Sequence, residues 1–370
     1  MSIVRHFVDD ATRQDPRARI NTEKLGRMTD FTAFQLIIEP VGDNLLTIRR
    51  GSAVALDSGG FFFFDGDTLV GATNLDTGAF TVGRDYYIYL CDTGNPQDAG
   101  RIVISLNATF PSGWNAITSR KIGGFHFGVN RRINTAGQPV NSAGVAFGDN
   151  WEANTFNGIV PRSIWTLQHR PKCDPEGMVY LTGGVWVDIY QSSDDGAGGF
   201  LSRHNATPIT GTEGLNCYAF IERMLQTGKR LLTHQEFIQA AMGSPQGEAG
   251  AGNNNNAWAN GTARALTGTV VRAVSAVGCR DCVGNVWEWL NDMIGSGIQN
   301  APATTGAWRN PMPDQGFGQL WLWNENDFRA LVAGGSWGNA ANAGARCVAL
   351  SNFPWDVSAS VGGRGACDSL

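Results

Sequence analysis

Glycine is the residue that most limits the folds open to this chain, because 48 of its 370 positions are glycine. An average globular chain has about 7% glycine, and glycine weakens the interior of a helix or strand. Short apolar runs such as residues 61–64 and 86–90 lie between clusters of Gly, Asn and Asp. This pattern is typical of short strands joined by turns. We therefore expect a compact, turn-rich protein, neither a coiled coil nor a disordered chain.

Charge and hydropathy argue against two classes of function. Charged residues make up 16% of the chain and the formal net charge is −5, whereas a surface that binds nucleic acid is usually basic. No apolar run approaches the ~18 residues of a membrane helix. Residues 1–10 lack the apolar segment of a signal peptide. We expect no nucleic-acid partner, no membrane insertion, and synthesis in the cytoplasm without a signal peptide.

The pattern of strands and turns predicts three parts. Residues 1–50 contain short candidate strands, and we expect a β-rich N-terminal segment. Residues 51–160 repeat strand and turn signals at the spacing of a β-sandwich-like domain. Residues 161–370 differ, because helical patterns join the strands. The predicted fold class is an α+β C-terminal domain preceded by an all-β N-terminal region.

Two helices are predicted in the C-terminal part. Apolar residues recur at helical spacing from Cys217 to Leu225, and Gly228 ends the pattern. Thr233 and Glu236 form a capping box, in which each side chain satisfies the other residue's free backbone N–H. The second helix therefore begins at Thr233.

The cysteines and histidines give no signal for a catalytic or metal site. Seven cysteines are irregularly spaced, and Cys279-x-x-Cys282 lacks the second pair of ligands that a structural zinc site requires. We expect mostly reduced, buried thiols. Glu288 lies between two tryptophans, where a buried, hydrogen-bonded structural role is the favoured interpretation. We predict neither a catalytic residue nor a metal ligand.

Four phrases of the C-terminal part, in this order and spacing, resemble the formylglycine-generating-enzyme branch of the C-type lectin fold. They are Gly-Met-Val-Tyr-Leu-Thr-Gly-Gly at 177–184, the run at 228–241, Gly-Asn-Val-Trp-Glu-Trp at 284–289, and Gly-Gly-Ser-Trp with Gly-Ala-Arg-Cys at 334–347. The tail, which ends in Gly-Gly-Arg-Gly-Ala-Cys-Asp at 362–368, resembles the variable region of proteins diversified by retroelements. The resemblance implies a C-type lectin-like domain at 161–370 with a variable region at about 334–370.

In that family, mutagenesis at adenines changes chosen codons, fixed residues form a scaffold, and the mutable residues line a ligand-binding surface. The resemblance places the ligand-binding positions on Ser336, Gly338, Asn339, Ala340, Asn342, Ala349, Ser351, Asn352, Asp356, Ser358, Ser360 and Val361. It assigns to the scaffold Trp287, Trp289, Gly334, Gly335, Trp337, Arg346 and Arg364. Changing the two adenines of an AAY codon can yield every residue of the first set but never tryptophan, so Trp337 and Trp355 belong to the scaffold.

The resemblance also implies a function. We expect a receptor-binding protein of a phage or prophage tail tip, located in the virion, whose partner is a cell-surface protein or glycan. The family further implies a homotrimer, with residues 1–50 serving assembly or trimerisation.

Two alternatives stay open. A tail adhesin or lectin of fixed specificity could use calcium, for which Asn324–Asp327 is the candidate loop, and otherwise no cofactor is expected. An oxidase of the formylglycine-generating type needs a cysteine pair after the Gly-Gly-Ser-Trp phrase. Residues 338–345 contain no cysteine, so we expect no enzyme.

Overall fold

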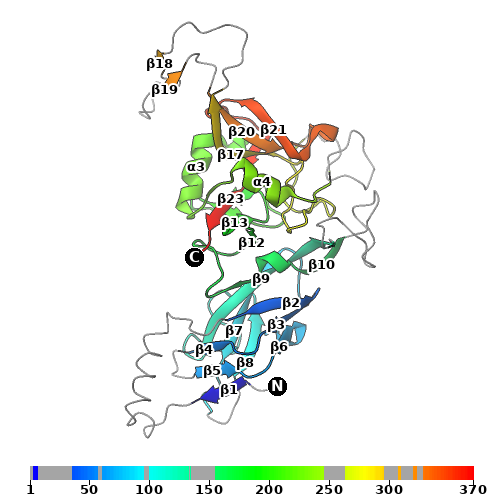
Figure 1. The fold of residues 1–370 in the computed structure, drawn as a ribbon, viewed down its shortest axis with the longest axis vertical. Coiled ribbons are helices and arrows are strands. Elements are labelled where there is room, and N and C mark those ends of the chain that lie inside the picture. The colour runs from blue at the N-terminus through cyan, green and yellow to red at the C-terminus, as the bar shows by residue number, and fades with distance from the viewer. Residues whose placement is uncertain are drawn as a thin grey trace. The chain divides into compact units, whose positions relative to one another are not determined.

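The structure is a computed structural model. It describes residues 3–6, 36–56, 61–95, 100–132, 134, 155–245, 263–295, 307–309, 320–322 and 328–370. The chain divides into two compact units: residues 1–128 with 157–170 and 370, and residues 129–156 with 171–369 (Figure 1). We call them the N-terminal unit and the C-terminal unit and describe each by itself.

Strands make up most of the described regular structure of the N-terminal unit. They are β1 (Ile3–His6), β2 (Ile38–Gly42), β3 (Leu45–Ile48), β4 (Ala53–Ala55), β5 (Phe61–Phe64), β6 (Thr68–Gly71), β7 (Arg84–Cys91), β8 (Arg101–Ser105), β9 (Ser119–Arg131), β10 (Thr155–Ile159) and β11 (Trp165–Thr166), with the 3-10 helices η1 (Ala72–Asn74) and η2 (Pro161–Ser163). The sheets have the orders β1-β5-β4, β2-β3-β6 and β10-β9-β7-β8, and β11 also pairs with β9.

One apolar core joins these sheets. Its extent does not agree with either of the two predicted domain boundaries. Alternate residues of β7, among them Tyr86 and Ile88, are buried in it, as expected for a strand with one face inward. Ile48 of β3 and Phe62 of β5 share this core, so the boundary predicted at residue 50 runs through a continuous packing unit. Residues 161–170 also belong here, because β11 pairs with β9, and the C-terminal unit resumes at residue 171.

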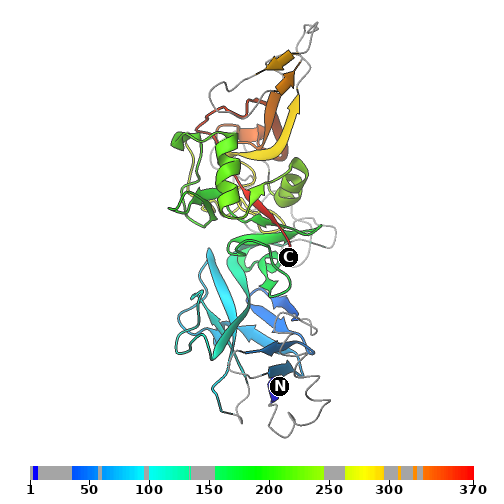
Figure 2. The ribbon, with the colours of Figure 1, turned by 90° about the vertical axis from the view of Figure 1, so that its left-hand side faces the viewer.

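The described part of the C-terminal unit combines two four-stranded sheets, two two-stranded sheets and two α-helices (Figure 1 and Figure 2). Its elements are β12 (Met178–Leu181), β13 (Val185–Asp188), β14 (Ser192–Asp194), β15 (Phe200–Ser202), η3 (Gly211–Glu213), α3 (Cys217–Gln226), β16 (Arg230–Leu231), α4 (His234–Ala241), β17 (Trp287–Gly295), β18 (Ala307–Arg309), β19 (Leu320–Leu322), β20 (Phe328–Gly334), η5 (Ala340–Asn342), β21 (Gly344–Asn352), β22 (Val361–Gly363) and β23 (Gly365–Asp368). One sheet has the order β12-β13-β23-β16 and the other β21-β20-β17-β22.

Both predicted helices are confirmed. Helix α3 begins after Asn216, whose side chain accepts a hydrogen bond from the Ala219 N–H, and Gly228 follows its end with a φ of 70°. Left-handed backbone at this position is the usual role of glycine after a helix. In α4, the Thr233 N–H donates to Glu236 at 2.8 Å and the Glu236 N–H donates to Thr233 at 3.3 Å.

Some segments lie outside the described residues. Most of the Gly/Asn-rich stretch 134–157 is one of them, but its last three residues belong to β10. The calcium candidate Asn324–Asp327 also lies outside the described residues. Among the described residues, no helix is long and apolar enough to cross a membrane.

Candidate functional site

Two consecutive glycines start the turn that leads into the candidate site. Gly334 ends β20 with a φ of 91°, and Gly335 follows with a φ of 88°. A Cβ on Gly334 would collide with the carbonyl oxygen of Cys282, and one on Gly335 would lie 2.6 Å from the Cβ of Ala343. Only glycine fits both the backbone angles and the space at these positions. The scaffold role of the pair stays a prediction.

The turn itself is closed by a short polar motif. The Asn339 carboxamide oxygen accepts hydrogen bonds from the Ser336 N–H at 2.8 Å and from its hydroxyl at 2.7 Å. The Trp337 N–H donates to the Asn285 carbonyl at 2.8 Å, which ties the turn to the segment before β17. Ala340 has a φ of 46°, an unusual value for a residue with a side chain. The turn is therefore held in one conformation by the Asn339 side chain and by the backbone contact between Trp337 and Asn285.

Strand β21 lies at an edge of its sheet, and its pairing with β20 is irregular. Val332 pairs with Ala349 and Ala330 with Asn352, so one extra residue of β21 lies between these pairs. Such a bulge changes which side chains face outward. Leu350 and Ser351 are in consequence both exposed, although neighbours on a regular strand point to opposite faces.

The loop after β21 runs to β22, which is at the opposite edge of the sheet, and backbone contacts fix it. The carbonyl of the buried Pro354 accepts from the Cys217 N–H at the start of α3 (3.0 Å). The carbonyl of Ser358 accepts from the Gly211 N–H at 2.9 Å, and that of Ser360 from the Trp287 N–H at 2.8 Å. Because the main chain makes these contacts, the side chains at 358 and 360 are free to differ without loss of the anchors.

A stack of three side chains supports the start of this loop. The Arg329 guanidinium lies 3.6 Å from the centre of the Phe353 ring, and Phe353 stacks on Trp355 with 4.9 Å between ring centres. Cation–π and stacked aromatic contacts each stabilise by about 1 kcal/mol. Trp355 is therefore packed against Phe353, and its assignment to the scaffold stays a prediction.

The strand register places eleven of the twelve predicted positions in two groups, one at each end of the sheet β21-β20-β17-β22. Trp287 pairs with Val361, Glu288 with Ala333 and Gly334 with Gly344, so the turn at 336–342 and the segment 358–361 reach the same end of the sheet. The other end is defined by Ala330 opposite Asn352, and it holds the positions at 351, 352 and 356. Ala349 lies between the groups.

Burial separates ten of the twelve positions from the other two. Ser336 is 6% exposed and Val361 3%, so neither can present its side chain to a ligand, and we move both to the scaffold. The other ten are exposed or half-buried. We call them the candidate face: Gly338, Asn339, Ala340, Asn342, Ala349, Ser351, Asn352, Asp356, Ser358 and Ser360.

The predicted scaffold residues differ in burial. Trp289 and Arg364 are fully buried, Trp287 is partly buried and packs against the same core, and Trp337 is half-buried. Arg346 is exposed on β21. Its side chain therefore has no packing role that would require arginine, and it borders the candidate face.

Two exposed apolar side chains next to the face were not predicted. Leu350 is 48% exposed and Val357 55% exposed. Each adjoins a predicted position, Leu350 beside Ser351 and Val357 beside Asp356. Sequence periodicity could not reveal Leu350, because the bulge interrupts the alternation that such an inference uses.

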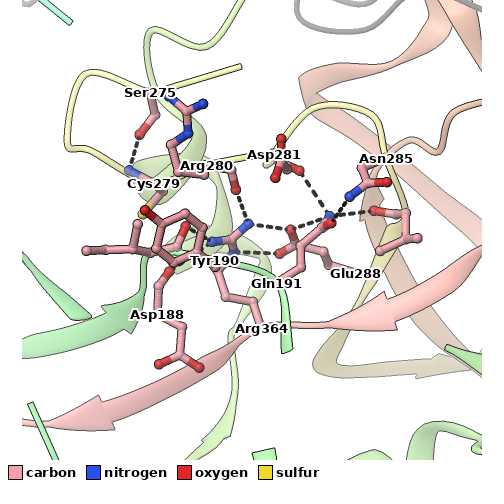
Figure 3. A network of polar contacts seen from close by, with 12 residues as sticks. Asp188, Tyr190, Gln191, Ser275, Cys279, Arg280, Asp281, Asn285, Glu288 and Arg364 are labelled. Carbon is pink, nitrogen blue, oxygen red and sulfur yellow. Dashed lines mark hydrogen bonds and ion pairs between the residues drawn. The ribbon is translucent and has the colours of Figure 1, made fainter. Parts of the chain in front are cut away.

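A network of buried polar groups includes Glu288 of β17 and Arg364, which follows β22 (Figure 3). The Arg364 guanidinium donates to both carboxylate oxygens of Glu288, at 3.0 and 2.7 Å. It also donates to the backbone carbonyls of Asp188, Ile189 and Arg280, at 2.9, 2.6 and 2.6 Å. A buried charge is tolerated when its hydrogen-bonding capacity is filled in this way. The buried structural role predicted for Glu288 is confirmed.

Amide side chains extend this network to the turn. The Gln191 amide donates to Glu288 at 3.2 Å, and the Asn285 amide donates to Gln191 at 2.9 Å. Asn285 is the residue whose carbonyl receives the Trp337 N–H. A continuous set of contacts therefore connects the buried Arg364 to the exposed turn.

A second buried ion pair fixes the strand that follows Arg364. Lys229 lies 2.6 Å from the Asp188 carboxylate, whose other oxygen accepts the Gly365 N–H at 3.1 Å. Burial alone would lower the pKa of Lys229, but the Asp188 carboxylate reverses this effect and raises it. The ion pair therefore joins the end of β13 to the residue before β16, and the Asp188 carboxylate also binds the first residue of β23.

Within the described ranges, no group of three or more His, Cys, Asp or Glu side chains is arranged to hold a metal ion. The candidate face is instead a set of small, mostly polar side chains on a rigid support. Its chemistry suits reversible binding.

Comparison with known proteins gives matches over most of the chain. A family model described as the Mtd second domain matches residues 37–152. A tail fiber receptor-binding protein of Bordetella phage BPP-1 is 28% identical over 349 residues, which cover 89% of this chain and 81% of that protein.

Solved structures give the same result. The Major Tropism Determinant M1 variant matches with a TM-score of 0.70 and 26% identity, covering 92% of this chain and 87% of the other. The U1 variant matches with a TM-score of 0.69 and 26% identity, covering 92% and 86%. The chain therefore resembles the tropism determinants along nearly its whole length and shares their C-type lectin-like fold.

Proposed function

We propose that this chain is a receptor-binding protein of a phage or prophage tail tip, which displays a variable surface on a C-type lectin-like scaffold. The observation that carries the proposal is the resemblance to a tail fiber receptor-binding protein over 89% of the chain. The structure of the C-terminal unit supports it, because backbone carbonyls at Pro354, Ser358 and Ser360 anchor the loop that carries part of the candidate face. In the turn, the Asn339 side chain also accepts hydrogen bonds from Ser336.

The binding positions in this proposal are the ten residues of the candidate face. Substitutions at exposed positions usually change stability by no more than about 0.5 kcal/mol. The face can therefore change its ligand while the fold is kept. Leu350 and Val357 add exposed apolar area beside it, the kind of surface that gains most when a ligand covers it.

The partner in this proposal is a protein or glycan on a bacterial cell surface. The face in this sequence has small side chains, so we expect weak affinity for each site. Several copies on one particle would raise the overall affinity through effective concentration. We accordingly propose a homotrimer within the virion, and sedimentation of the purified chain measures its mass.

The two alternatives differ from this proposal in their requirements. A lectin of fixed specificity that used calcium would lose binding in EDTA, whereas the proposed face needs no metal. An oxidase would convert a cysteine-containing peptide in the presence of copper. The proteins that this chain resembles are named for receptor binding and tropism, not for catalysis.

A whole-cell binding assay tests the function. Fluorescently labelled full-length protein is mixed with a panel of intact bacterial strains, and bound protein is measured by flow cytometry. Binding to at least one strain is expected, and Ser351→Arg or Asn342→Arg should reduce it at least about tenfold while the thermal midpoint stays unchanged. Gln226→Arg, on the exposed end of α3, is the matched control. Equal loss in all three variants would contradict the assignment of the face.

A further inference from the structure

Cys173 and Cys367 are opposite each other although 194 positions separate them. The segment before β12 runs antiparallel to the end of β23. Pro171 forms a β-bridge with Ser369, and the Lys172 N–H donates to the Asp368 carbonyl at 2.9 Å. If this register continues by one more residue pair, Cys173 lies opposite Cys367. In agreement, the Cys173 N–H donates to the Cys367 sulfur at 3.3 Å.

This placement brings the two cysteines close to the geometry of a disulfide. Directly opposed residues of an antiparallel pair have Cβ atoms about 4.5–5.5 Å apart. A disulfide requires about 3.5–4.5 Å between Cβ atoms, with Cα atoms about 4.4–6.8 Å apart. Besides burial, the proximity of Cys367 is one of the causes that raise the pKa of the Cys173 thiol. A small adjustment of the side chains, with no change in strand register, is enough to form the bond.

The two sulfurs differ in access to solvent. Cys173 is half-buried, whereas Cys367 is buried in β23. Burial raises the pKa of the Cys173 thiol, and the nearby Lys229 ammonium opposes this effect. Cys173 is therefore the thiol that an external reagent reaches first, and it reacts slowly at neutral pH because it is mainly protonated.

We propose that Cys173 and Cys367 are a site of disulfide formation, which closes the C-terminal unit when the protein meets a low-molecular-weight disulfide. The Cys173 thiolate attacks one sulfur of the reagent, forms a mixed disulfide and releases one small thiol. Cys367, on losing its proton, attacks the Cys173 sulfur and releases the second small thiol. Two protein thiols are oxidised and one small disulfide is reduced to two thiols.

The bond would join the first and last segments of the C-terminal unit. Strand β23 lies between β13 and β16 and follows directly on Arg364, so it holds the end of the segment that carries the candidate face. Closing so long a loop restricts the unfolded chain strongly, which is the main source of stabilisation in the loop-entropy model. The proposal stands independently of the receptor-binding function.

Another cysteine pair provides an internal comparison. Cys279 and Cys282 also lie close together, but both are buried. Cys347 is partly exposed on β21. We expect a mild oxidant to join Cys173 to Cys367 before it affects the pair at 279 and 282.

The experiment treats the full-length protein with oxidised glutathione at pH 8, blocks free thiols by alkylation and identifies linked peptides by mass spectrometry. A peptide linking residues 173 and 367 is expected, together with a rise in the thermal midpoint of about 5 °C or more that dithiothreitol reverses. Cys173→Ser, at a half-buried position, should abolish both effects, and Cys347→Ser should abolish neither. Cys173 that remains a mixed disulfide with glutathione, or remains free while Cys347 reacts, would overturn the proposal.

Discussion

The buried centre around Arg364 and the candidate face belong to the same unit, yet they hold their residues in opposite ways. At the centre, the guanidinium makes five hydrogen-bonded contacts, to Glu288 and to three backbone carbonyls. On the face, the anchors at Pro354, Ser358 and Ser360 are backbone carbonyls. Side-chain identity therefore matters at the centre and matters less along this loop, whereas in the turn the Asn339 side chain itself accepts hydrogen bonds from Ser336.

This difference explains how one fold can carry a surface that changes. A polar group left without its partner in the interior costs much more than an exposed one, since water cannot replace the missing bond. The scaffold places its specific side chains where substitution is costly and supports the exposed loops through the main chain. Substitutions at the centre, in the turn and on the face test this contrast.

Removing the central arginine should cause the largest loss. Arg364→Met leaves the Glu288 carboxylate buried without its partner, and breaking such a pair costs about 3–5 kcal/mol of unfolding free energy. Urea denaturation measures this loss. Arg346→Met, at an exposed position of β21, is the control and should change the free energy by less than about 0.5 kcal/mol. Similar losses in the two variants would remove the distinction between centre and surface.

The glycines of the turn offer a matched pair. Gly334→Ala should destabilise by about 2 kcal/mol or more, because the backbone is left-handed and the added methyl group meets the Cys282 carbonyl. Gly338→Ala should be nearly neutral, since no atom lies within 4 Å of the added Cβ. Thermal denaturation of both proteins measures the difference. If Gly338→Ala cost as much as Gly334→Ala, the turn would not be fixed as described.

A surface ion pair near the loop should give a smaller, pH-dependent effect. Glu213 accepts hydrogen bonds from Arg264 at 2.9 and 2.6 Å, and this contact lowers the pKa of the Glu213 carboxyl below its usual 4.5. A lowered pKa means that the stabilisation is complete above the usual value and is lost as the pH falls through the folded-state value.

The corresponding variant is Glu213→Gln. It should lose no more than about 1 kcal/mol at pH 7, because the pair is partly exposed to solvent. The difference from the unmodified protein should shrink as the pH falls below about 4. Glu222→Gln, at an exposed position of α3, serves as the control and should show no such trend. A difference that grew toward low pH would contradict the sign of this effect.

Substitutions on the face should have the smallest effect on stability. Each of Ser351→Tyr, Asn342→Tyr and Ser358→Tyr should change the unfolding free energy by less than about 0.5 kcal/mol. Circular dichroism melts check the stability, and the whole-cell assay checks binding. Losses above 2 kcal/mol at these positions would show that the face takes part in the scaffold.

Local features of the fold could be predicted from the sequence, and features that depend on distant pairing could not. Helix α3 and the Thr233 capping box depend on residues a few positions apart, so spacing alone predicts them. Glu288 could be predicted to be buried, but its partner Arg364 is 76 positions away and no local pattern connects them. The boundary at residue 50 was misplaced for the same reason.

The candidate site was predictable only in part. The resemblance predicts the segment 334–370, and ten of the twelve positions are exposed or half-buried. The burial of Ser336 depends on its bonds to Asn339, and that of Val361 on packing against the sheet core. The exposure of Leu350 depends on a bulge set by the neighbouring strand β20. These are tertiary effects that a list of variable positions does not contain.

Sequencing the DNA beside the gene tests the division between face and scaffold most directly. The account predicts a near-copy of the segment encoding residues 334–370 next to a reverse transcriptase gene. The two copies should differ only at adenines of the template, and the differences should fall on the codons of the candidate face. The codons of Gly334, Gly335 and Arg364 should be identical in the two copies. The absence of any such copy, or differences spread equally over these three codons, would contradict the account.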